Sequence, residues 1–61
     1  MAGAPTAQLS SIATALEELA ARVTELADRH SGTDRDDVAV DLYEVERSLH
    51  EARRRLAKLI A

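Results

Sequence analysis

Apolar residues recur in the first half of the chain at alternating steps of three and four residues. They are Leu9, Ile12, Leu16, Leu19, Val23 and Leu26. This spacing is a heptad repeat, in which positions a and d of the letters a to g form one stripe along a helix. Leu9, Leu16 and Val23 occupy position a, and the other three residues occupy position d. The pattern predicts a helix over residues 6–30, with both limits approximate.

The second half of the chain repeats this stripe with steps of four and three residues. Its members are Val38, Leu42, Val45, Leu49, Ala52, Leu56 and Leu59. Acidic residues dominate the early part of the segment, from Asp34 to Glu46, and basic residues dominate its end, from Arg53 to Lys58. The helix dipole favours this order of charges. A second helix is therefore predicted over about residues 35–60.

A short polar segment separates the two stripes and predicts a turn at about residues 31–34. Gly32 can adopt the left-handed conformation that often ends a helix. Thr33 or Asp34 can cap the helix that follows, because their side-chain oxygens accept hydrogen bonds from free backbone amides. So short a connection makes consecutive helices antiparallel neighbours. We therefore expect residues 6–61 to form an all-α, two-helix antiparallel hairpin.

Small residues flank the stripe of the first helix, because position e holds Ala13, Ala20 and Ala27. A stripe that covers a, d and e is typical of helices in bundles. A chain of 61 residues without Cys, Phe or Trp depends on helix packing or oligomerisation for stability. We expect the a and d residues to hold the hairpin together, and a second copy to cover the alanines in a homodimeric four-helix bundle. The expected self-association core is Leu9, Ile12, Leu16, Leu19, Val23, Leu26, Val38, Leu42, Val45, Leu49, Leu56 and Leu59.

The net charge of −3 makes the chain a poor match for nucleic acids and for anionic membranes, both of which attract basic surfaces. Residues 1–5 are expected to form a flexible lead-in, and they lack the basic and apolar regions of a secretory signal. No segment reaches transmembrane length without charges. Seven Arg against one Lys, with abundant Ala, is typical of high-GC bacterial genomes. We therefore expect a small bacterial protein located in the cytoplasm.

Catalytic chemistry has little support in the sequence, and no enzyme activity is expected. His30 and His50 could form a metal pair or a pH switch, but they fall in different helices, several turns apart in a hairpin. Glu46 flanks the stripe at position e, and no nucleophile, oxyanion donor or second acid accompanies it by spacing. Two straight helices offer no evident concave pocket. We expect no metal, no cofactor and no small-molecule ligand.

Two groups of residues are candidates for contact with a partner. Val40, Tyr43 and Arg47 follow one another along the outer side of the second helix, and Tyr and Arg are enriched at interface hot spots. Arg54 and Lys58 share a face in the basic end of the same helix. Alternatively, the bundle is wider than the heptad stripe and covers the residues of the first group. The alternative for the second group is a solvated end that complements the helix dipole.

Two families resemble this outline of two heptad segments joined through His30-Ser31-Gly32. The hairpin resembles the small RNA-binding Rop proteins of plasmids, which are acidic helical hairpins that dimerise into four-helix bundles. It also looks like a shortened version of the WXG-type secreted hairpins, although the turn lacks the Trp of that motif. Both resemblances concern architecture, and neither assigns a functional residue to this chain.

Three functional hypotheses follow. The first is a non-enzymatic protein–protein interaction module, acting as a small adaptor, scaffold or regulator that self-associates as a homodimer. The second is a Rop-like RNA-binding dimer, which the acidic charge disfavours. The third is one half of an obligate hetero-complex, such as an antitoxin-like partner, in which another protein supplies the missing core.

Overall fold

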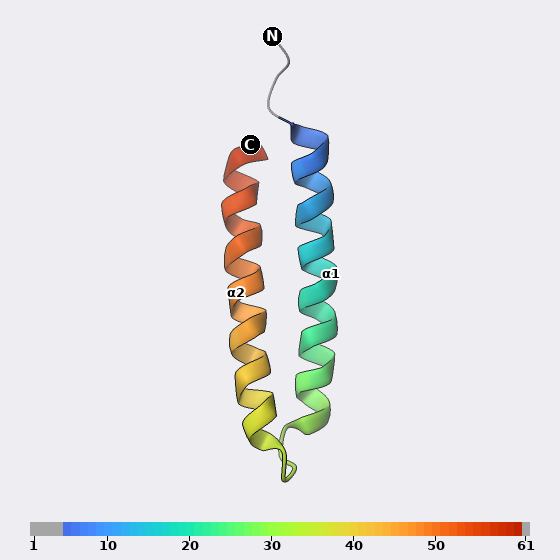
Figure 1. Cartoon of the computed structure of the whole chain (residues 1–61), viewed down its shortest axis with the longest axis vertical. Helices are drawn as coiled ribbons and strands as arrows, with labels where there is room; N and C mark the ends of the chain where they lie inside the picture. Colours follow the sequence, from blue (N-terminus) through green and yellow to red (C-terminus); the bar gives the residue numbers. More distant parts are fainter. Residues whose placement is uncertain (1–4, 61) are drawn as a thin grey trace.

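The computed structural model describes residues 5–60 as two long antiparallel helices joined by a short turn (Figure 1). Helix α1 covers Thr6–His30 and helix α2 covers Asp36–Ile60. The two helices pack along one another, which confirms the prediction of an all-α hairpin. Neither helix provides the long uncharged apolar stretch that a membrane crossing requires within residues 5–60. Apart from Pro5, which precedes α1, the predicted lead-in lies outside the described residues.

The turn between the helices depends on a glycine in a left-handed conformation. Gly32 has a φ of 77°, and it is the only residue with positive φ among those described. Gly32 has no Cβ, so it adopts this conformation without the steric penalty that other residues meet. Its backbone amide donates a hydrogen bond of 2.7 Å to the Asp36 carboxylate, which links the turn to the first residue of α2.

Thr33 connects the end of α1 to the start of α2. Its hydroxyl donates a hydrogen bond of 2.6 Å to the His30 carbonyl and accepts one of 3.1 Å from the Arg35 amide. Both contacts satisfy backbone groups that have no partner inside a helix. Of the two predicted caps, Thr33 makes these contacts, and α2 begins at Asp36.

The two helices meet through positions a and e of the heptads. Ala20, Ala27 and Ala39 occupy position e and are 3%, 0% and 1% exposed. The leucines and valine at position a are half-buried beside them. They are Leu9, Leu16, Val23, Leu42, Leu49 and Leu56. No large side chain is completely buried within the described residues, so alanine forms the innermost layer of the hairpin.

This arrangement corrects the expectation that a second copy covers the alanine face. Ala20 and Ala27 are buried inside the hairpin itself, and Ala13 is half-buried there. Alanine has the smallest apolar side chain, so a stripe of alanines lets two helices approach closely, with more contact per unit length. The partner helix therefore turns toward position e and away from position d. The residues left without cover are at position d, including Leu19 and Leu26.

Polar contacts join the helices along one side of the seam. Thr24 donates a hydrogen bond to the Glu46 carboxylate, and Tyr43 donates one of 2.6 Å to the Asp28 carboxylate. A third contact is an ion pair, in which the Arg53 guanidinium lies 4.0 Å from the carboxylate of Glu17. The α1 members of these pairs occupy positions b and f, away from position d. We call this side of the hairpin the b face.

The alanine seam predicts that the packing tolerates no larger side chain at its centre. Replacing the fully buried Ala27 with Leu forces the helices apart and should destabilise the fold by about 1–3 kcal/mol. Chemical unfolding followed by circular dichroism measures this change. Ala21→Leu is the matched control, because Ala21 lies in the same helix and is exposed. Equal stability of the two variants would contradict the seam.

Candidate protein-binding face

Large apolar side chains at position d are exposed on both helices. The exposed fractions are 49% for Ile12, 44% for Leu19, 43% for Leu26, 45% for Val45 and 62% for Leu59. We call these five residues the d face. Single exposed apolar residues are ordinary on protein surfaces, but a continuous apolar patch marks an interaction site.

The geometry of the helix places these residues on one side of the hairpin. Successive residues are rotated by about 100°, so position d lies about 60° to one side of position a and position e about 40° to the other. Seen from one end, antiparallel helices rotate in opposite senses. Because both helices point a and e at each other, both d stripes lie on the same side. The b face lies on the opposite side.

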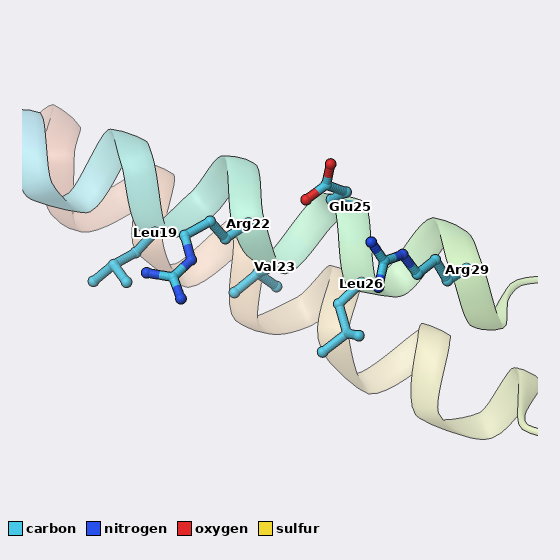
Figure 2. Close-up of a pocket in the computed structure, with 6 residues that line it drawn as sticks. All are labelled: Leu19, Arg22, Val23, Glu25, Leu26 and Arg29. Carbon is cyan, nitrogen blue, oxygen red and sulfur yellow. The ribbon is translucent and has the colours of Figure 1, made fainter.

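Leu19 and Leu26 of the d face line an open groove of about 400 Å³ on α1. In Figure 2, Leu19, Val23 and Leu26 point to the same side of α1, and Arg29 extends back along the helix toward Leu26. Arg22 and Glu25 complete the charged lining of the groove. An open apolar groove with a charged edge suits the side of another helix better than an enclosed small molecule.

Charged residues line the edges of the d face at position g. On α1 this edge holds Gln8, Ala15, Arg22 and Arg29. On α2 the edge contains Asp41 near the turn and Arg55 near the other end, with Ser48 between them. All three of these α2 residues are exposed. The α2 edge is therefore acidic at one end and basic at the other.

The predicted contact group of Val40, Tyr43 and Arg47 lies away from the d face. All three residues are exposed, and they occupy positions b and f of α2. Tyr43 is held against α1 by its hydrogen bond to Asp28, which fixes its ring on the b face. This group therefore forms a second surface, separate from the d face.

The basic end of α2 is also exposed. The Arg54 guanidinium lies 3.7 Å from the Glu51 carboxylate one turn earlier, and Lys58 follows near the end of the helix. An exposed pair of this kind contributes about 0–1 kcal/mol, so it leaves the Arg54 side chain accessible.

The two histidines lie apart, as expected in an antiparallel hairpin. His30 Nδ1 lies 3.0 Å from the Leu26 carbonyl at the end of α1. His50 Nε2 lies 3.8 Å from the carboxylate of Glu46, which accepts the hydrogen bond from Thr24. Within residues 5–60, no three His, Asp or Glu side chains form a group that could hold a metal ion. Each histidine therefore lies near a group about one turn earlier in its own helix.

The heptad pattern predicts the apolar stripe correctly, but it does not predict how the stripe is divided between the hairpin and its surroundings. The pattern predicts positions a and d between the two helices and the alanines outside, whereas the structure buries the alanines and leaves position d exposed. The signal for the correct division is Ala at three successive e positions of α1 (Ala13, Ala20 and Ala27), since close helix approach needs small residues on the facing side.

Known proteins provide no further guide to this face. Comparison of the chain with protein-family models, with curated proteins and with solved structures finds no match in any of the three.

The contact between Tyr43 and Asp28 predicts an unusual titration. The hydrogen bond to the Asp28 carboxylate raises the pKa of the Tyr43 phenol above its ordinary value of 10.0, with further contributions from desolvation and from the charge of Asp28. Since the folded-state pKa is the higher one, this contact stabilises the fold below about pH 10 and is lost as the pH rises through the raised pKa.

Tyrosinate absorbance measures this pKa directly, because Tyr43 is the only tyrosine and the chain has no tryptophan. Asp28→Ala should return the pKa toward its ordinary value. Asp34→Ala is the matched control, an exposed aspartate in the turn that should leave the pKa raised. An unchanged titration in Asp28→Ala would show that Asp28 is not the cause.

Proposed function

We propose that this protein is a non-enzymatic interaction module that forms a homodimer through its d face and acts in the cytoplasm as a small adaptor, scaffold or regulator. The observation that supports this proposal most directly is the exposure of five large apolar residues on one side of the hairpin. Two such faces in contact form a four-helix bundle, with the a and e seam inside each hairpin and the d residues between them.

The weak core of the hairpin is the energetic argument for a second copy. Its only completely buried side chains within residues 5–60 are alanines, and alanine burial contributes little. Fully burying a Leu, Ile or Val side chain contributes about 1.5–3 kcal/mol. A dimer would add a fraction of this amount for each of ten d-face residues, five per copy. Small scaffolds commonly obtain missing stability from oligomerisation in this way.

A second copy on the d face leaves both b faces on the outside of the bundle, pointing in opposite directions. Each dimer would then present the stripe of Val40, Tyr43 and Arg47 twice, together with two basic ends at Arg54 and Lys58. A module with two identical outer surfaces can join two partner molecules, and simultaneous binding increases the effective affinity. This property suits an adaptor or scaffold.

Molar mass measured by light scattering after size exclusion tests the proposal. The wild-type chain should give twice its mass of 6.6 kDa. Replacing Leu19 and Leu26 together with Gln should reduce the mass toward one chain, because Gln keeps helix propensity and removes the apolar contact. Val40→Gln is the matched control, since Val40 is exposed on the other side of the hairpin and its replacement should leave the dimer intact.

Three results would contradict the proposal. A wild-type chain that is fully helical at the mass of one chain would show that the hairpin needs no second copy. A dimer that survives in the Leu19 and Leu26 double variant would show that association uses another surface. A weakly helical monomer would instead favour an obligate complex with a different protein.

A further inference from the structure

The d residues of each helix are arranged symmetrically about a midpoint. On α1, Ile12 and Leu26 lie seven residues to either side of Leu19. On α2, the midpoint of the d positions falls between Ser48 and Leu49, and the d residues are placed symmetrically about it. They are Val38, Val45, Ala52 and Leu59. Each helix can therefore pair its d residues with those of an identical antiparallel helix.

The two midpoints lie level with each other in the hairpin. The cross-helix contacts join Thr24 to Glu46 and Asp28 to Tyr43. Helical side chains lean toward the N-terminus of their own helix, so each contact lies about one residue before the Cα atoms of the two residues that make it. With this correction, Leu19 is level with about residue 49 of α2. One axis perpendicular to the helices can therefore pass through both midpoints.

A two-fold rotation about this axis superposes the d face on itself in both helices at once. It places α1 on α1 and α2 on α2 of the second copy, with the two turns at opposite ends. Leu19 then meets Leu19 of the second copy, and Ile12 meets Leu26. On α2, Val45 meets Ala52 and Val38 meets Leu59. Each layer of the interface is apolar.

The charges along α2 are complementary under the same rotation. At position g, Asp41 comes opposite Arg55 of the second copy. The acidic end of the α2 edge at position g thus faces the basic end of the same edge in its counterpart. On α1 the edges bring Arg22 toward Ala15 and Arg29 toward Gln8, which introduces no contact between like charges.

The alternative two-fold axis runs parallel to the helices and fits less well. It places α1 on α2 of the second copy, where the d residues of the two helices alternate by about half a heptad. Asp41 would lie near Arg29, but Arg55 and Lys58 would face the uncharged part of α1 around Ala15 and Gln8. This arrangement leaves the basic end of α2 without an acidic counterpart.

From this match of apolar layers and charges, we propose that the second copy docks on the d face about the perpendicular two-fold axis, with Leu19 on the axis and Asp41 paired with Arg55 of the second copy. This proposal rests on the proposed homodimer and specifies its arrangement. The dimer then has its turns, and its two basic ends, at opposite ends of the bundle.

Disulfide trapping tests the arrangement, and the absence of native cysteine makes the result unambiguous. In Leu19→Cys, the two sulfurs meet at the axis, so mild oxidation should shift the protein from one chain mass to two on a non-reducing gel. Leu26→Cys is the matched control because its side chain is almost equally exposed, 43% against 44%. Its two copies would lie about 21 Å apart along the bundle, at 1.5 Å per residue, and should stay uncrosslinked.

A double variant keeps the test valid if a single cysteine disturbs the packing. In the double variant Ile12→Cys with Leu26→Cys, the sulfur at position 12 of each copy meets the sulfur at position 26 of the other copy. This variant should therefore also crosslink, whereas Ile12→Cys alone should not. The alternative axis holds the two α1 helices diagonally across the bundle, beyond the Cα separation of about 7 Å that a disulfide can span.

Molar mass under reducing conditions distinguishes a dimer with a different arrangement from a chain that does not dimerise. Variants that are dimeric when reduced but do not crosslink through Leu19→Cys would overturn the perpendicular axis and leave the homodimer standing. A wild-type chain that is monomeric under the same conditions would overturn both proposals.

The paired charges provide an independent measurement. Asp41→Arg alone should weaken dimerisation, because it sets a second positive charge opposite Arg55 of the second copy, and adding Arg55→Asp should restore it. The expected loss and recovery appear as a shift of the dissociation constant in dilution experiments. No recovery in the double variant would contradict the pairing of Asp41 with Arg55.

Discussion

The close contact of two helices through alanine at position e is the constraint on which the rest of the structure depends. Ala20, Ala27 and Ala39 have almost no exposed surface, and they determine which side of each helix faces the other. Because alanine is small, this contact brings the helices together but buries little apolar area. The same choice leaves the larger side chains at position d exposed. The tight seam and the uncovered apolar face are therefore two consequences of one packing arrangement.

The hairpin separates its surface into two sides with different chemistry. Polar contacts between the helices, from Thr24 to Glu46 and from Tyr43 to Asp28, lie on the b face. Five exposed Leu, Ile and Val side chains lie on the d face, whereas Val40 is exposed on the other side. Water satisfies the first surface, whereas the second gains free energy when another apolar surface covers it. In the proposed dimer, the d face is covered by the second copy and the b face stays available to a partner.

The two helices and the turn could be predicted because their signals are local. Heptad spacing defines the helices, and Gly32 with Thr33 defines the break between them. The division of the stripe could not be predicted in the same way. Positions a, d and e of α1 are all apolar, so periodicity alone does not say which two face the partner helix. That choice depends on how closely the helices approach, and so do the contacts of Glu46 and Tyr43, which are set by packing between distant parts of the chain.

The central claim is that the hairpin obtains part of its stability from a second copy on the d face. The most direct measurement is the midpoint of thermal unfolding, followed by circular dichroism over a wide range of chain concentrations. If folding is coupled to dimerisation, the midpoint rises as the concentration increases, because mass action favours the folded dimer. A midpoint that is the same at every concentration, with full helicity throughout, would contradict the account and show that the alanine seam alone maintains the fold.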